Sequence, residues 1–150
     1  MKITFIGHRT VFNCKNLTEI IRKTILENTN SNEHILFYCG GYGDFDNLCA
    51  NVCRSIKKER ENSELVYVTP YITESHQKKI EYLMSLKLYD STVYPELENV
   101  PYRLAIIKRN EWMITEADLV ISYINHEYGG AYKSFLFAKR KNKRFINLAK

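Results

Sequence analysis

The sequence is poor in residues that interrupt regular structure, and it lacks a long apolar run. It has 3 prolines and 6 glycines in 150 residues, with no internal repeat or low-complexity stretch, so nothing indicates a disordered or fibrous protein. Only a few apolar residues precede Gly7, too few for a signal-peptide core, and no run approaches the length of a membrane span. We therefore expect a single cytoplasmic domain over 1–150, with no membrane contact.

Cysteine is scarce for a disulfide scaffold. The 4 cysteines are Cys14, Cys39, Cys49 and Cys53. In a reducing cytoplasm structural disulfides are rare, which leaves a metal site or a catalytic thiol as the alternatives to simple packing. Cys49 and Cys53 lie on the apolar stripe of a predicted helix, where cysteine behaves as a small buried hydrophobe. We expect no metal site and no cofactor.

An excess of positive charge is present, but it is modest. The net charge of +5 and the basic segment KRKNKR at 139–144 permit nucleic-acid binding. The basic residues lie at the end of a predicted helix, where cations complement the helix dipole, and no aromatic-rich RNA-binding motif accompanies them. A solvated helix end is the favoured interpretation, and nucleic acid is a possible partner that we do not favour.

Apolar runs alternate with helical patterns along the whole chain. The hydrophobic fraction of 45% is enough to build a core. Strands are predicted at 3–6, 35–38, 65–68, 91–94, 118–124 and 144–148, and helices at 17–28, 44–56, 80–88, 101–116 and 129–140. Asn16 and Glu19 resemble a capping box at the start of the first helix. Strands that are apolar throughout indicate a parallel sheet covered on both faces, so we predict a doubly wound, Rossmann-like α/β fold.

Ligands of such sheets bind beyond the carboxyl ends of the strands, so the loops at 7–9, 40–46 and 126–131 are the informative ones. The segment Gly40-Gly41-Tyr42-Gly43 lies between a predicted strand and a predicted helix. Glycines allow close backbone approach, and the N–H groups at a helix start attract an anion, as in a phosphate cradle. Tight turns use the same residues. The segment is neither a Walker A loop nor a GxGxxG fingerprint.

Asp44 and Asp46 follow this glycine segment directly. A carboxylate at a helix start is a common cap, but it would repel a phosphate placed on the same N–H groups. Alternatively, the two carboxylates face a bound ribose, where they hydrogen-bond its hydroxyls or stabilise the oxocarbenium-like centre of a breaking N-glycosidic bond. They are therefore our candidates for catalytic residues.

Further candidates lie in the other loops and on one helix. Arg9 can hold a phosphate with two hydrogen bonds, and the glycine pair at 129–130 repeats the strand, glycine and helix order. Solvated charge is the default for an arginine on a helix, although the helix near 101 can border the site. The candidate ligand-binding residues are Gly7, His8, Arg9, Gly40, Gly41, Tyr42, Gly43, Arg103, Arg109, Asn110, Gly129 and Gly130.

Three segments together resemble a known superfamily. They are FIGHR near the start, CGGYGDFD in the middle, and YPELENVPYRLAIIKRNEWMITEADLVISYINHEYGGAYKSFLFAKRKNKRFINLAK at the end. The combination is similar to the Rossmann-like SLOG superfamily, which joins the DprA proteins and the LOG phosphoribohydrolases, and within it to the branch related to YpsA. The LOG motif PGGxGTxxE aligns with 39–47, where Asp44 replaces the threonine, Asn47 replaces the glutamate and Asp46 lies one position earlier.

The resemblance implies a nucleotide-type ligand more firmly than a reaction, and it implies a homodimer. Our first hypothesis is a sensor or binding protein for a nucleotide, a nucleotide sugar or an NAD or ADP-ribose type of molecule. The alternative is a LOG-like hydrolase that cleaves the N-glycosidic bond of a nucleoside 5′-monophosphate. A third hypothesis, taken from the DprA likeness and the basic charge, is binding of single-stranded DNA.

Overall fold

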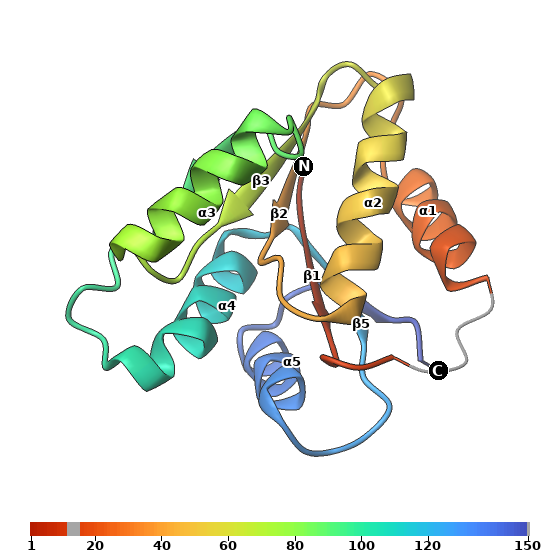
Figure 1. Cartoon of the computed structure of the whole chain (residues 1–150). Helices are drawn as coiled ribbons and strands as arrows, with labels where there is room; N and C mark the ends of the chain where they lie inside the picture. The colour runs from red at the N-terminus through yellow and green to blue at the C-terminus, as the bar shows by residue number, and fades with distance from the viewer. Residues whose placement is uncertain (12–15, 150) are drawn as a thin grey trace.

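Parallel strands form one sheet in the computed structural model, which describes residues 1–11 and 16–149 (Figure 1). The sheet is six-stranded in the order β4-β3-β2-β1-β5-β6. The strands are β1 (Lys2–Gly7), β2 (Ile35–Cys39), β3 (Ser63–Val68), β4 (Ser91–Val93), β5 (Leu119–Tyr123) and β6 (Phe145–Asn147). The helices are α1 (Leu17–Glu27), α2 (Asp44–Glu59), α3 (Glu74–Ser85), α4 (Ala105–Glu116), α5 (Gly130–Arg140) and the short 3-10 helix η1 (Tyr102–Leu104). The predicted Rossmann-like α/β fold is confirmed.

Helices cover both faces of the sheet. Alternate strand residues point to opposite faces, so Ile3 and Phe5 pack with α1 and α2, whereas Ile6 packs with α4 and α5. Figure 1 shows α1 beside α2 and α4 near α5, on different sides of the sheet. Cys49 and Cys53 are buried in the core on the α2 side, as their stripe predicts. None of the described helices is long and apolar enough to cross a membrane.

The strand order reverses between β1 and β5. The chain runs from β1 outward through β2 and β3 to β4, and then returns to place β5 on the other side of β1. Their register runs from Ile3 opposite Leu119 to Gly7 opposite Tyr123. The loops after β1 and β5 therefore leave the same sheet edge in opposite directions, which opens a crevice between them.

Three local predictions differ from the structure. The helix predicted at 80–88 is α3, which begins six residues earlier and spans Glu74–Ser85. Asn16 has a left-handed backbone (φ 66°) and its side chain makes no capping hydrogen bond, so the predicted capping box is wrong. A capping side chain reaches the helix N–H groups from an extended backbone, which Asn16 does not adopt. The helix predicted from 101 begins instead at Ala105, because Pro101 is extended and is followed by the turn η1. Cys14 lies outside the described residues.

Candidate functional site

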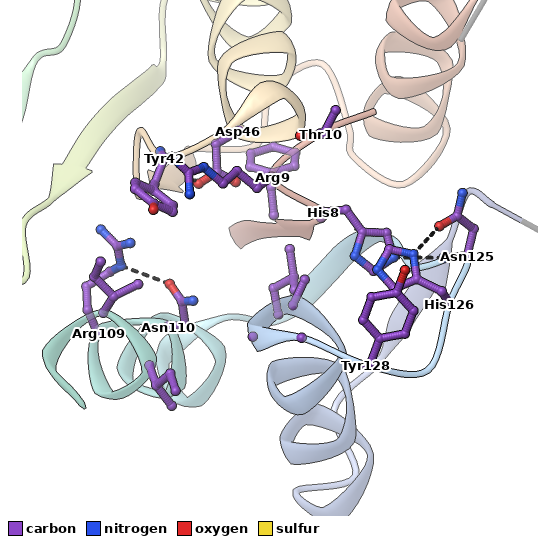
Figure 2. Close-up of a pocket in the computed structure, with 18 residues that line it drawn as sticks. His8, Arg9, Thr10, Tyr42, Asp46, Arg109, Asn110, Asn125, His126 and Tyr128 are labelled. Atoms are coloured by element: carbon purple, nitrogen blue, oxygen red, sulfur yellow. Dashed lines mark hydrogen bonds between the residues drawn. The ribbon is translucent and has the colours of Figure 1, made fainter. Parts of the chain in front are cut away.

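A pocket of about 620 Å³ lies at the crevice between β1 and β5 (Figure 2). The loops after these two strands, the starts of α2 and α5, and one side of α4 line it. Its volume is typical of small-molecule sites, and its place at the reversal of strand order is where such folds bind ligands.

The glycine segment after β2 is closely packed against protein. A Cβ on Gly40 would lie 2.8 Å from the guanidinium carbon of Arg109, and one on Gly41 would lie 2.8 Å from the ring of Tyr67. Gly43 has a positive φ of 98°, and a Cβ there would lie 2.8 Å from Cα of Arg9. These three glycines do not line the pocket. Their lack of side chains serves the packing of β2, β3 and α4 around the turn.

Protein acceptors already occupy two N–H groups at the start of α2. The N–H of Tyr42 donates to the Asp46 carboxylate at 3.1 Å, and the N–H of Asp44 donates to the Arg9 carbonyl at 2.8 Å. The first turn of α2 also carries both Asp44 and Asp46. This helix start is therefore less suited to an anion than the sequence pattern indicates.

Arg109 is a buried cation beneath the glycine segment, with 2% of its surface exposed. Its Nη1 donates to the carbonyls of Gly40 at 3.0 Å and Val68 at 2.9 Å, and its Nε donates to Oδ1 of Asn110 at 2.8 Å. Burial lowers the pKa of the guanidinium, and the negative charge of Asp46 opposes that shift. The side chain connects the carboxyl ends of β2 and β3 to α4.

The two candidate carboxylates have different positions. Asp46 is partly buried and lines the pocket, where desolvation raises its pKa to about 6 against the opposing charge of Arg109 and the N–H of Tyr42. Asp44 is exposed and lies outside the pocket lining, and its Oδ2 accepts the N–H of Val11 at 3.0 Å. Asp46 is thus the acid that can exchange a proton inside the pocket, whereas Asp44 holds the loop after β1 to α2.

Three aromatic rings form a stack on the opposite wall (Figure 2). The ring centres of His8 and His126 lie 3.5 Å apart, with an angle of 11° between the ring planes. The ring centres of His126 and Tyr128 lie 4.0 Å apart, with an angle of 30° between the planes. Nε2 of His8 accepts the N–H of Asn125 at 3.0 Å. Burial and the neighbouring His126 lower the pKa of His8, so this ring is neutral at pH 7 and carries its proton on Nδ1.

The start of α5 is open. Gly129 has a positive φ of 90° before the helix, and Gly130 is its first residue. Both line the pocket, and a Cβ on either would meet no atom of the described residues within 4 Å. The first N–H groups of a helix have no acceptor within it, so they are available to a ligand here. Arg9 lines the same pocket, with its guanidinium carbon 5.3 Å from the centre of the Tyr42 ring.

The structure brings most of the predicted site residues together. Those that line the pocket are Gly7, His8, Arg9, Tyr42, Asp46, Arg109, Asn110, Gly129 and Gly130. Those that do not line it are Gly40, Gly41, Gly43, Asp44 and Arg103. Arg103 is exposed on η1, before α4 begins. Among the described residues, no group of His, Cys, Asp or Glu is arranged to hold a metal ion.

Several residues that line the pocket are not among the site residues predicted from the sequence. They are Phe5, Ile6, Thr10, Ile106, Ile107, Asn125, His126, Tyr128 and Ala131. His126 and Tyr128 lie in the loop at 126–131, which was singled out for its place after a strand, so a systematic choice of its aromatic residues would have found them. Asn125 carries no such signal, because its role depends on contacts with a residue more than a hundred positions away.

No protein-family model and no curated protein sequence matches this chain. The fold is similar to solved structures of DNA processing protein A (DprA). For the protein from Streptococcus pneumoniae, the TM-score is 0.62 at 12% identity, over 96% of this chain and 48% of that one. For the protein from Helicobacter pylori, whose structure is described for its single-stranded DNA binding mode, the TM-score is 0.60 at 15% identity, over 97% of this chain and 63% of that one. This chain therefore spans less than two thirds of either relative, and the likeness establishes a shared Rossmann-like fold.

Proposed function

We propose that this chain binds a small phosphate-bearing molecule of the nucleotide type in the pocket between β1 and β5, as a sensor or binding protein. The ligand classes are nucleotides, nucleotide sugars and NAD or ADP-ribose derivatives. The observation that carries the proposal is the open start of α5, where Gly129 and Gly130 face a pocket of ligand size beside Arg9.

Charge favours α5 over α2 as the phosphate site. The first turn of α2 holds two carboxylates, whereas the first turn of α5, all of which the structure describes, holds no acidic residue. A phosphate at α5 therefore meets the positive end of the helix dipole without a nearby negative charge on that turn. Arg9, on the loop after β1, supplies a guanidinium that matches phosphate oxygens in geometry.

The test is to incubate the purified chain with nucleoside monophosphates, nucleotide sugars and NAD derivatives, and to identify retained and released compounds by liquid chromatography with mass detection. We expect an intact compound to be retained. Gly130→Val places a side chain over the helix start and should reduce this retention by at least about tenfold, whereas Lys141→Ala, past the other end of α5, should not. Equal retention by both variants, or retention of no compound, would contradict the proposal.

A second candidate function is hydrolysis of the N-glycosidic bond of a nucleoside 5′-monophosphate. The observation in its favour is the Asp46 carboxyl, which lines the pocket and has a pKa of about 6, close to the range that suits a general acid or base. Release of free base that is lost in Asp46→Asn but kept in Asp44→Ala would support it. Turnover that survives in Asp46→Asn would remove Asp46 from any such mechanism.

Single-stranded DNA binding is a third candidate, favoured by the fold shared with the Helicobacter pylori protein and by the net charge of +5. The measurement is the affinity for a short oligonucleotide at several salt concentrations. Contacts with the phosphate backbone predict a steep fall in affinity with ionic strength, since bound counterions are released. An absence of binding at low salt would exclude this candidate.

A further inference from the structure

The outermost ring of the three-ring stack has one face that no other aromatic ring of the described residues contacts. Tyr128 is 71% exposed, although one of its faces contacts His126 at 4.0 Å and its side chain lines the pocket. The side chain of a tyrosine in an exposed loop is normally not held in one position. Here the ring is held in place by its neighbour while its other surface stays accessible to the pocket.

One residue, Asn125, holds the two inner rings. Its N–H donates to Nε2 of His8 at 3.0 Å, and its side-chain oxygen lies 2.9 Å from Nδ1 of His126, which must then donate. His8 itself is 6% exposed, so the innermost ring of the stack is held in the protein interior. The stack therefore exists before any ligand arrives, and a flat partner would lose little further side-chain freedom on binding to it.

The other exposed tyrosine rings near the pocket are less suited to a flat ligand. Tyr42 is 46% exposed, and the guanidinium of Arg9 lies over its ring. Tyr102 stacks on Tyr71 with their centres 4.2 Å apart, and it does not line the pocket. Among the described residues, Tyr128 therefore combines an exposed ring, a rigid support and a place in the pocket wall.

We infer that Tyr128 is the base-recognition residue of the site: its exposed face stacks on the purine or pyrimidine of a bound nucleotide. This inference rests on the proposed phosphate site at α5. Tyr128 directly precedes Gly129 and Gly130, so base and phosphate would be held by neighbouring parts of one loop, as the span of a single nucleotide requires. Stacking accepts any aromatic base, so the site selects nucleotides over simple sugar phosphates without strong preference among bases.

The experiment measures binding of adenosine 5′-monophosphate, uridine 5′-monophosphate and ribose 5-phosphate to the full chain by titration calorimetry. We expect both nucleotides to bind about tenfold more tightly than ribose 5-phosphate. In Tyr128→Leu this ratio should fall to near one, with ribose 5-phosphate unaffected. Tyr128→Phe, which keeps the ring, should preserve the ratio. The base protons should shift upfield in NMR spectra with the wild type and Tyr128→Phe, but not with Tyr128→Leu.

The outcomes separate this inference from the proposed function. If ribose 5-phosphate and the nucleotides bind equally to the wild type, or if Tyr128→Leu keeps the ratio, the stacking site is wrong while the phosphate site stands. If none of the three compounds binds, the phosphate site and the stacking site both fail. Because Tyr128 is largely exposed, its variants should unfold at the wild-type temperature. An unchanged melting temperature would exclude misfolding as the cause of a lost preference for nucleotides over ribose 5-phosphate.

Discussion

Arg109 is a charged side chain that is 2% exposed beside the carboxyl ends of β2 and β3. Its guanidinium satisfies the carbonyls of Gly40 and Val68, which have little access to water. Arg109→Met keeps much of the volume but leaves both carbonyls without this donor, so the free energy of unfolding should fall by about 3 kcal/mol. Arg103→Met, at an exposed position on η1, should change it by less than about 0.5 kcal/mol. Urea denaturation of both variants checks this, and equal losses would contradict it.

Asp46 makes stability depend on pH. Its pKa is raised to about 6 in the folded protein, so between about pH 4 and pH 6 the folded chain keeps a proton that the unfolded chain has lost. The stabilisation that this carboxyl contributes should therefore be largest below that range and should decrease by about 3 kcal/mol as the pH rises through it. Asp46→Asn should lack this fall. Unfolding curves of the two proteins between pH 4 and pH 7 test it, and parallel pH profiles would show that the carboxyl titrates normally.

Two glycines show how elements meet at the site. At Gly7, strand β1 passes α2 so closely that a Cβ would lie 2.3 Å from the ring of Phe45. At Gly130, at the start of α5, a Cβ would meet no atom of the described residues within 4 Å. Neither residue has a positive φ, so alanine is compatible with both backbones. Gly7→Ala should lower the free energy of unfolding by about 1 to 3 kcal/mol. Gly130→Ala should leave it unchanged or raise it by up to about 1 kcal/mol.

Thermal unfolding of this matched pair distinguishes packing from ligand access. A large loss in both variants would mean that the start of α5 is packed against protein in solution. A loss in Gly7→Ala alone would show that the glycine at 130 has no role in stability. Weaker nucleotide binding in an otherwise stable Gly130 variant would then place the ligand at this helix start.

The pocket lies at the reversal of strand order and is built by elements from the whole molecule. A ligand bound there would therefore stabilise the whole fold against unfolding. The pocket draws on β1, α2, α4, α5 and the loop after β5, all of which separate on unfolding. A ligand at a hundred times its dissociation constant should therefore stabilise the folded chain by about 2.7 kcal/mol. For a chain of this size that shifts the melting temperature upward by about 5 to 10 °C. Differential scanning fluorimetry with the retained compound tests this, and at the same ligand concentration the shift for Gly130→Val should be at most about half as large.

The fold class, and the edge of the sheet at which the pocket lies, could both be predicted from the sequence. Both follow from local patterns: short apolar runs that alternate with helical stripes predict buried parallel strands, and the loops at their carboxyl ends then share one edge. The weakly patterned stretch after Pro70 contains a helix and a short strand, as predicted, but α3 begins at Glu74 rather than near 80. The capping box at Asn16 failed because residue types at the right spacing do not specify a backbone conformation.

Which glycine segment is open, and which acid faces the pocket, depends on tertiary contacts. The segments at 40–43 and 129–130 read alike in sequence, but Arg109, Tyr67 and Arg9 pack against the first, whereas no described residue fills the space at the second. Asp44 and Asp46 are two residues apart, yet a helix start directs one towards Val11 and the other into the pocket. The stack of His8 on His126 likewise joins the ends of β1 and β5, which are neighbours in the sheet but far apart in the sequence. Each of these features depends on contacts between segments far apart in the chain, and local spacing carries no information about such contacts.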